Sequence, residues 1–394
     1  MELLALLCTA VIFVLEIVVA SGSNNIYKDV FQNYAKELVP TWNAPTPLKL
    51  SFSAAPSTIV SFTELEEKLT LTMSVTVNWT DHRLGWNPTL YNNTYTLTIP
   101  PHDIWLPYLY LANSVNDVKP IGQEADFYVI LVADGSVYWT PGGVFEAQCT
   151  PDVSKFPFDT QLCLFFFTMW GILPADVEFN VYSKVPNLSY FAANSDWTVV
   201  DTFQNASLIG TGSSAFVMGI SIKRKPIYYV VTVILPTLLF CLMNPLMFCL
   251  PVESGERISL GMTILLAYAI FLTIVSASIP AKSDPLCTIL LVLVCIMMVS
   301  GVIVILTIIS AYYYYMEDVS HANPCLRRLT LRFNRKQKDK KNLEEDKDTN
   351  SNSLSGSNLT GKDLSKTLDI IFCVISFVTF IGILSAYFLF IFIS

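Results

Sequence analysis

Charge is scarce in this sequence. Asp, Glu, Lys and Arg make up 14% of the 394 residues, whereas a soluble domain carries about 25%. The net charge of −8 argues against a surface that binds the phosphates of nucleic acid. With three histidines and no Cys-x-x-Cys motif, the chain gives no indication of a metal site or a cofactor. This composition disfavours a wholly cytosolic enzyme, a disordered chain and a nucleic-acid-binding protein.

Apolar residues take the place of charge, at 53% of the chain, and gather in five runs. The first run covers residues 3–20 and ends in small residues, as a secretory signal does. We therefore expect a signal peptide over residues 1–21. The alternative is an uncleaved N-terminal anchor, because the first residues supply no positive charge.

The other four runs are expected to cross a membrane, because each approaches the ~20 residues that a helix needs to span ~30 Å of hydrocarbon. They are residues 227–250, 258–279, 286–310 and 369–393. Four spans after a removed signal place the N-terminal domain and the C-terminus outside the cell. We therefore predict an extracellular domain, three spans, a cytoplasmic loop and a fourth span, at residues 22–224, 225–316, 317–368 and 369–394.

Two features agree with this topology. The loop 317–368 contains eleven of the chain's 24 basic residues, an enrichment typical of cytoplasmic loops. Within it, residues 326–341 favour a basic helix that can rest on anionic lipid, and residues 342–366 have the composition of a disordered segment. The glycosylation pattern Asn-x-Ser/Thr occurs in the predicted extracellular domain at Asn78, Asn92, Asn187 and Asn205.

The cysteines also fit this organisation. Of the nine, only Cys149 and Cys163 fall in the predicted extracellular domain. In an oxidising compartment each has one possible partner, so we expect a disulfide between them. The alternative is two free, buried thiols.

Residues 60–222 have the pattern of short strands. The stretch 69–77 alternates apolar residues with Thr and Ser, a period of two that is typical of a half-buried strand. Similar patches lie at residues 95–99, 127–132, 162–168, 177–182 and 216–222. Their regular spacing predicts an all-β, immunoglobulin-like sandwich, with a short amphipathic helix over residues 25–38 before it. The expected fold class is this sandwich followed by an all-α four-helix transmembrane bundle.

The segment between Cys149 and Cys163 contains Phe156-Pro157-Phe158-Asp159. It closely resembles the signature loop of the Cys-loop receptors, the pentameric ligand-gated ion channels. Further stretches resemble nicotinic acetylcholine receptor subunits in the same order, at residues 79–82, 104–107 and 253–260. The resemblance covers residues 25 to 394. It implies a multi-pass subunit of the plasma membrane that assembles with four others, as a homo- or heteropentamer, and is opened by a small extracellular ligand.

The second predicted span carries a graded stripe at helical spacing. The stripe consists of Glu256, Ser259, Thr263, Leu266, Ile270 and Ile274, which share one face of a helix. In a pentamer these positions form a carboxylate ring, two hydroxyl rings and an aliphatic constriction. The hydroxyl rings can replace part of an ion's hydration shell, and the aliphatic constriction can gate by dewetting. The alternative is an ordinary lipid-buried helix whose hydroxyls bond to their own backbone carbonyls.

We expect the permeant ions to be monovalent cations. A Glu256 ring at the cytoplasmic mouth attracts cations if Arg257 faces away from the pore, as the resemblance implies. The Pro-Ala insertion typical of anion-selective relatives is absent from this stretch. Residues 21–222 hold eight basic and eighteen acidic residues, a net charge of −10 that enriches cations above the membrane.

The ligand site is where the resemblance weakens. The candidate ligand residues are Trp170, Phe216, Tyr138, Ala112 and Ser74. Trp170 matches the central tryptophan of the aromatic box that holds a quaternary ammonium in acetylcholine receptors. Ala112 stands where the first tyrosine of that box is expected, and Ser74 where the tryptophan of the opposite face is expected. Residues 205–216 contain neither an adjacent cysteine pair nor a tyrosine. We therefore expect a ligand other than acetylcholine.

A basic cluster at residues 223–225 lies on the outer side of the first span, against the usual charge bias. The resemblance implies that Arg224 pairs with acidic residues at the boundary between domain and membrane. The candidate coupling residues are Arg224, Glu64, Phe156, Pro157, Phe158 and Asp159. The alternative is that basic side chains snorkel to the lipid headgroups, chiefly at positions 223 and 225. The linker 280–285 is expected to contact the disulfide loop and looks shorter than in nicotinic subunits.

Three classes of function remain to be weighed. The first is a subunit of a ligand-gated cation channel, acting alone or as an accessory subunit. The second is a non-conducting membrane glycoprotein that binds ligand, which gives no reason for the polar stripe. The third is an enzyme, for which the sequence offers no set of nucleophile, base and acid.

Overall fold

The computed structural model describes residues 25–40, 46–123, 125–172, 175–209, 213–277, 279, 285–317, 322–345 and 359–393. The expected signal peptide and all but the last residue of the linker 280–285 lie outside these ranges. The chain divides into two compact units. One contains the chain up to Pro151 and again Thr160–Arg224, and the other contains Asp152–Asp159 and everything from Lys225 onward.

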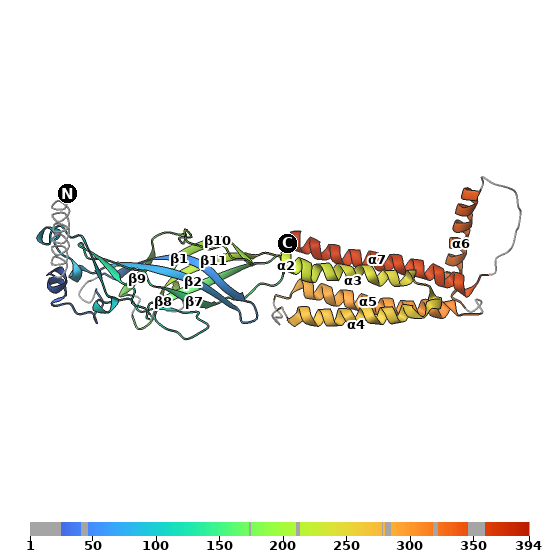
Figure 1. Ribbon diagram of the computed structural model, residues 1–394, viewed down its shortest axis with the longest axis horizontal. Helices are drawn as coiled ribbons and strands as arrows, with labels where there is room; N and C mark the ends of the chain where they lie inside the picture. The colour runs from blue at the N-terminus through green and yellow to red at the C-terminus, as the bar shows by residue number, and fades with distance from the viewer. Residues whose placement is uncertain are drawn as a thin grey trace, which may run out of the picture. The chain divides into compact units, whose positions relative to one another are not determined.

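The first unit is a sandwich of two β-sheets, as predicted (Figure 1). One sheet has the strand order β3–β5–β6–β2–β1–β9, with β7 also pairing with β2. Its strands are β1 (Leu48–Thr63), β2 (Lys68–Thr80), β3 (Thr96–Ile99), β5 (Val129–Val132), β6 (Ser136–Trp139), β7 (Gly142–Gln148) and β9 (Val177–Val181). The other sheet has the order β10–β11–β8–β4. Its strands are β4 (Leu109–Leu111), β8 (Thr160–Met169), β10 (Trp197–Ile209) and β11 (Ser213–Arg224).

The core of the sandwich follows from the two-residue period of its strands. On β2, the side chains of Leu69, Leu71, Met73, Val75 and Val77 are all buried. Aromatic rings from both sheets belong to the same core. Phe52 of β1 stacks on Phe216 of β11, with ring centroids 5.1 Å apart. Burial of this apolar surface, at roughly 25 cal/mol per Å², is the main source of the domain's stability.

Two long strands escape prediction from periodicity. Strand β1 contains Pro56, and its pairing with β2 shifts register between Pro56 and Thr58. Such a bulge accommodates a proline that cannot donate a backbone hydrogen bond, and it breaks the alternation that marks a strand. Strand β10 has a similar register shift, between Val199 and Asp201. Both strands therefore carry an interrupted pattern.

The helix expected over residues 25–38 is shorter, because the helical residues end at 31 and turns follow. These turns bring the Tyr34 hydroxyl to Asp81, to which it donates a hydrogen bond of 2.9 Å. Asp81 is fully buried and also accepts from Arg83 at 2.8 Å. Burial, the largest cause, raises the pKa of Tyr34. Longer helix would carry Tyr34 away from this buried ion pair.

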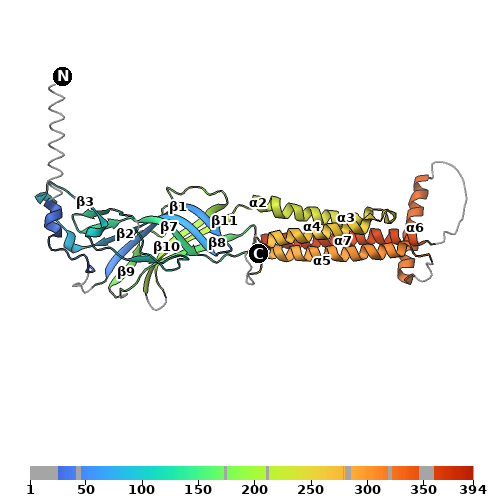
Figure 2. The same cartoon turned by 60° about the horizontal axis from the view of Figure 1, so that its bottom comes forward.

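The second unit contains the apolar helices, which run side by side in both views (Figures 1 and 2). Among the described residues, four segments are long and apolar enough to cross a membrane. They are Ile227–Cys249, Glu256–Ala277 (α4), Thr288–Tyr314 (α5) and Gly361–Ile393 (α7). The first combines α2 (Ile227–Tyr229), a π-helical stretch (Val230–Ile234), α3 (Leu235–Leu246) and a 3₁₀ turn (Met247–Cys249). These agree with the predicted spans within a few residues, except at the start of the last.

The last span begins earlier than expected. Residues 361–366 were predicted to be disordered but form the first turns of α7. The cause is local capping: the Thr360 hydroxyl and backbone N–H both donate to the Asp363 carboxylate, at 2.7 and 3.1 Å. Gly361 is buried against backbone carbonyls, where a Cβ would not fit. The basic helix predicted at residues 326–341 is present as α6 (Pro324–Glu345).

Candidate functional site

The stripe predicted on the second span lies on the exposed face of α4. Leu266, Ile270 and Ile274 are 64%, 55% and 62% exposed. Glu256, Ser259 and Thr263 are exposed on the same helix. The buried residues of α4 are Arg257, Gly261, Ile264, Tyr268 and Val275. One face of the helix therefore packs on the bundle, and the graded stripe is left facing outward.

The hydroxyl oxygens of the stripe can still accept a hydrogen bond or bind a cation. The Thr263 hydroxyl donates to the carbonyl oxygen of Ser259 at 2.9 Å, the back-bonding that an ordinary membrane helix also shows. A hydroxyl that donates its single proton still presents two lone pairs. Back-bonding at Thr263 is therefore compatible with oxygen atoms that face a cation.

The Arg257 side chain points into the bundle, away from the stripe. It is 3% exposed, and its two terminal nitrogens each lie 2.9 Å from a carboxylate oxygen of Asp369 on α7. Its Nε donates to the backbone carbonyl of Leu250 at 3.1 Å, and one of the terminal nitrogens, Nη2, also donates to the carbonyl of Phe248 at 3.0 Å. The neighbouring Glu256 is exposed. Adjacent side chains of opposite charge thus leave the helix on different sides.

A second carboxylate near this end of the bundle has partners of its own. Glu253 precedes α4 and is exposed. It accepts hydrogen bonds from the Tyr314 hydroxyl and from Lys362, the latter at 3.1 Å. The bond from Tyr314 and then that from Lys362 lower the pKa of Glu253. Its charge is therefore shared with Lys362.

The middle of the disulfide loop, Asp152–Asp159, belongs to the unit of membrane helices. Within Asp152–Asp159, the Phe156 carbonyl accepts a 3.1 Å hydrogen bond from the Tyr387 hydroxyl of α7. The Phe156 ring meets the Tyr229 ring edge to face at 4.7 Å. The Thr288 hydroxyl at the start of α5 donates to the Ser154 carbonyl. These contacts tie the loop to three spans. The coupling roles predicted for Phe156, Pro157, Phe158 and Asp159 stay predictions.

Arg224 ends strand β11 in a buried ion pair. Its guanidinium lies 2.6 Å from a carboxylate oxygen of Glu64 and 4.4 Å above the ring of Trp197. The flanking Lys223 and Lys225 are exposed. The three basic residues of the cluster therefore differ: the two lysines are exposed, and Arg224 is buried against Glu64 and Trp197. This is the arrangement expected for Arg224 and Glu64.

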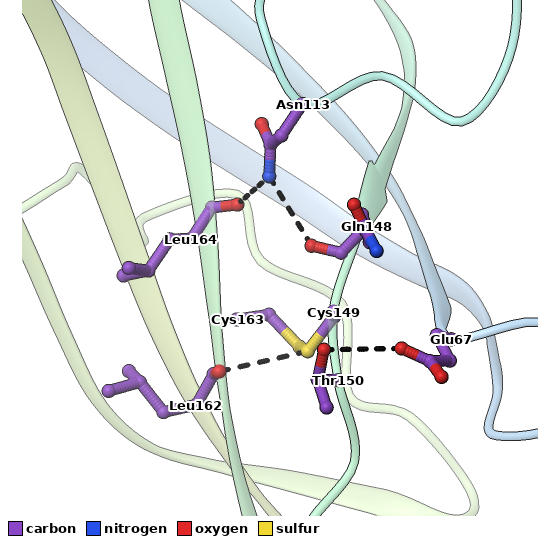
Figure 3. Close-up of a disulfide and its surroundings, with 8 residues drawn as sticks. All are labelled: Glu67, Asn113, Gln148, Cys149, Thr150, Leu162, Cys163 and Leu164. Atoms are coloured by element: carbon purple, nitrogen blue, oxygen red, sulfur yellow. Dashed lines mark hydrogen bonds between the residues drawn. A yellow bond between two sulfur atoms is a disulfide. The ribbon is translucent and has the colours of Figure 1, made fainter. Parts of the chain in front are cut away.

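The predicted disulfide is present: Cys149 and Cys163 are bonded, with Cα atoms 5.1 Å apart. Figure 3 shows Asn113 beside it, reaching two strands. Its side-chain nitrogen donates to the carbonyls of Leu164, at 2.8 Å, and Gln148, at 3.3 Å. Asn113 was not predicted from the sequence, because a single asparagine after a short strand belongs to no recognisable motif or periodic pattern.

Trp170 follows strand β8 and is 56% exposed, so its ring is available at the surface. Tyr110 of β4 stacks on it, with ring centroids 5.0 Å apart and planes 16° from parallel. Tyr110 lies two residues before Ala112, at the spacing that keeps residues on one side of a strand. Sequence reasoning recognised the missing ring at Ala112 and overlooked the one at Tyr110.

Phe216 must be removed from the ligand candidates. Its side chain is 0% exposed, between the rings of Phe52 and Phe167 in the sandwich core. The reason is the register of β11, where Phe216 pairs with Phe167 of β8. A ring held on both faces by core aromatics cannot contact a ligand at the surface.

Ser74 and Tyr138 lie in the other sheet, on β2 and β6, and both are half-buried. Tyr138 pairs with Asn78 across the sheet. Burial and then a hydrogen bond with Tyr182 raise the pKa of Tyr138. Trp170 and Tyr110 are thus separated from Ser74 and Tyr138 by the layering of the sandwich, and the five predicted ligand residues do not form one site within this chain.

The predicted glycosylation sites differ in exposure. Asn92, Asn187 and Asn205 are exposed, whereas Asn78 is half-buried on β2. Asn92 adopts a positive φ of 54° in a turn, a conformation that asparagine tolerates well. Modification at all four asparagines stays a prediction.

A disulfide-linked β-sandwich followed by four helices long and apolar enough to cross a membrane is the architecture of a multi-pass membrane protein with a folded domain outside the bilayer. The chain belongs to the neurotransmitter-gated ion-channel family. Its residues 23–226 match the neurotransmitter-gated ion-channel ligand binding domain, and residues 233–382 match the neurotransmitter-gated ion-channel transmembrane region. This is a family of ligand-gated channels and not of enzymes.

The relatives that the chain resembles are nicotinic receptor subunits. An acetylcholine receptor subunit delta from Xenopus laevis is 29% identical over 280 residues, which cover 66% of this chain and 53% of the relative. A neuronal acetylcholine receptor subunit alpha-10 from Homo sapiens is 31% identical over 267 residues, with 66% and 59% covered. An acetylcholine receptor subunit beta-type acr-2 from Caenorhabditis elegans is 30% identical over 260 residues, with 65% and 45% covered. The chain spans about half the length of these relatives.

Proposed function

We propose that this chain is a subunit of a pentameric, cation-selective channel that an extracellular ligand opens. Its α4 helices surround the axis and present Glu256, Ser259, Thr263, Leu266, Ile270 and Ile274 to the permeating ions. The observation that carries the proposal is the outward-facing stripe of α4, backed by a buried face on the same helix. A helix that only anchored the domain in lipid has no need of an exposed carboxylate and hydroxyls at this spacing.

The direction of selectivity follows from charge. Glu256 is exposed, and the cation next to it is withdrawn, because Arg257 is buried and paired with Asp369. Five such carboxylates at one level make a negative ring, which concentrates cations and repels anions. The net charge of −10 on residues 21–222 of each subunit acts in the same direction.

The ligand is proposed to be a small extracellular molecule other than acetylcholine. A box for a quaternary ammonium needs several aromatic faces, each contributing about 0.5–2 kcal/mol. Here Trp170 shares one of its faces with Tyr110, Phe216 lies in the core, and Ala112 and Ser74 supply no ring. Because Ser74 and Tyr138 lie in the opposite sheet, they would meet Trp170 only across the interface between two subunits.

The second candidate is an accessory subunit of a heteropentamer. The same loss of aromatic side chains favours it, since an accessory subunit contributes its α4 face to the pore and leaves ligand binding to its neighbours. A subunit of this kind shows the pore properties of α4 without a ligand response when it is expressed alone.

Expression of the chain alone in oocytes, with a ligand screen under voltage clamp, tests the proposal. Ligand-evoked cation current is the expected result for a homomeric channel. If the chain is silent, Leu266→Thr should give spontaneous cation current, because a hydroxyl in the aliphatic constriction lets water wet the closed pore. Continued silence of this variant, with the protein at the cell surface, contradicts the pore assignment.

A further inference from the structure

We propose that Asp369 on α7 is a positioning residue for the charge filter, by which we mean the proposed ring of five Glu256 carboxylates. It holds the Arg257 guanidinium inside the bundle, so that Glu256 alone sets the charge at the cytoplasmic mouth of the pore. This inference rests on the proposed channel function and adds the residue on which the filter depends. Asp369 itself lies on a different helix from the filter and does not touch the permeating ions.

The Asp369 carboxylate is held rigidly from two helices. Both of its oxygens bind the Arg257 guanidinium, each at 2.9 Å, a bidentate pairing that fixes direction as well as distance. The Ser310 hydroxyl of α5 donates to the same carboxylate and lies 3.0 Å from the Ser365 hydroxyl of α7. The side chains of Arg257 and Asp369 are 4% and 12% exposed. The carboxylate is therefore a fixed anchor inside the bundle.

Arg257 directly follows Glu256 in the chain, so anchoring Arg257 also affects the position of Glu256. Glu256 is the first residue of α4, and it follows Gly255, whose φ is +70°. The first N–H groups of a helix have no partner in a preceding turn, so this end frays more readily than the interior and side-chain contacts help to hold it. Neighbouring residues of a helix point about 100° apart. Holding Arg257 against α7 thus helps to keep Glu256 on a different, exposed side of the helix.

Without the Asp369 carboxylate, the Arg257 guanidinium loses this ion pair and keeps its hydrogen bonds to the carbonyls of Leu250 and Phe248. A buried cation without a counter-charge is unstable, and water at the end of the helix is its nearest source of solvation. Release of Arg257 toward this end brings a positive charge next to Glu256. In a pentamer, five such cations offset five carboxylates, so cation conductance and selectivity should fall.

Single-channel recording separates this role from a structural one. Asp369→Asn keeps the volume and removes the charge, and it should lower the unitary cation conductance about two- to fivefold while moving the reversal potential toward that of chloride. Asp369→Glu should conduct nearly as the wild type does. The double variant Arg257→Gln/Asp369→Asn should recover the wild-type conductance, because no cation remains to be released. A purely structural role changes the number of channels and not the unitary conductance, so wild-type conductance and selectivity in Asp369→Asn would overturn the proposal.

A chemical measurement decides the question without current. In the purified full-length protein, Arg257→Lys places an amine beside Asp369, where burial and the ion pair suppress its reaction with an acylating reagent. Adding Asp369→Asn should accelerate acylation at position 257 about tenfold, with the exposed amine of Lys362 as internal reference. Equal rates of acylation at position 257 contradict the proposal.

The two proposals fail differently. If Glu256→Gln alters neither conductance nor selectivity, the proposed filter is wrong, whatever Asp369 does. If Glu256→Gln has its effect and Asp369→Asn has none, the filter stands and only the role of Asp369 is lost.

Discussion

The exposed face of α4 and the aromatic surface at Trp170 carry the two halves of the proposed function, and they differ in extent. The α4 face presents a carboxylate, two hydroxyls and three aliphatic side chains along one helix. The aromatic surface presents one stacked pair, Trp170 and Tyr110. On the proposed function, conduction depends on many positions of one helix, whereas ligand recognition depends on few positions from several strands.

This difference shows where a nicotinic-like chain can vary. If α4 lines the proposed pore, its face works only as a continuous stripe, because an ion would pass every level of it in turn. A ligand site is assembled from separate strands, so single aromatic residues can be lost or moved, as at Ala112 and Tyr110, without any change to the sandwich core. Substitutions that affect one region and leave the other unchanged test whether the two halves are separable.

The largest effect is expected at the aliphatic constriction. Leu266→Thr removes about 1.5–3 kcal/mol of apolar burial from each subunit's contribution to the closed gate, so spontaneous opening should rise at least about 100-fold. Unliganded open probability in single-channel recordings measures this rise. Leu272→Thr is the matched control, because Leu272 packs against the bundle core. Spontaneous opening of equal size in both variants would show that the exposed face is not the gate.

The next effect concerns the aromatic surface. Trp170→Leu should weaken the response to an identified agonist about tenfold, through loss of a ring worth about 0.5–2 kcal/mol, with little change in thermal stability. Phe216→Leu should do the reverse, because that ring is a core contact: it should lower the unfolding temperature and leave agonist potency near the wild-type value. Concentration–response curves and thermal unfolding of the purified receptor measure both. A shift in potency with Phe216→Leu that exceeds that of Trp170→Leu would contradict the assignment.

A smaller effect is expected at the charge ring. Glu256→Gln should reduce unitary cation conductance about two- to fivefold, since it removes five charges from one level of the pore. Glu253→Gln is the control, because Glu253 is already paired with Lys362 and Tyr314. Single-channel conductance in symmetrical sodium compares them. An equal fall in both variants would mean that the conductance reports general surface charge and not a ring at Glu256.

The smallest effect should arise at the Arg224–Glu64 pair, which lies outside both regions. Glu64→Gln should reduce agonist efficacy about threefold, because the buried guanidinium of Arg224 loses the charge of the Glu64 carboxylate. Arg224→Gln should have a similar effect, and the double variant should be less impaired than the sum of the two. Macroscopic dose–response curves in a double-mutant cycle measure the coupling. Additive effects would indicate that the pair does not act as a unit.

The fold was predictable wherever one period dominates the sequence. The alternation of residues 69–77 located β2, and uninterrupted apolar runs located the four spans. Prediction failed where a local feature breaks the period. The bulge at Pro56 interrupts the alternation of β1, so that strand was not predicted. The hydrogen bond from Thr360 to Asp363 caps the start of α7, which lies in a segment of polar composition.

The candidate sites were predictable to the extent that their residues share one element. Helical spacing on α4 places the whole stripe on one face, and the burial of α4 agrees with it. The stacking of Tyr110 on Trp170 joins two strands, and the binding of Arg257 by Asp369 joins two helices 112 residues apart in the chain. No periodicity encodes such contacts, although an acidic residue within a membrane span is a signal of function in its own right.

The reversal potential under dilution of external sodium chloride tests the central claim most directly. It is recorded from the wild-type chain, or in the Leu266→Thr background if the wild type is silent. A tenfold dilution should move the reversal potential of a cation-selective channel toward negative values by up to about 59 mV. A shift of similar size toward positive values would mean that chloride carries the current, and it would contradict the account of Glu256 and Arg257.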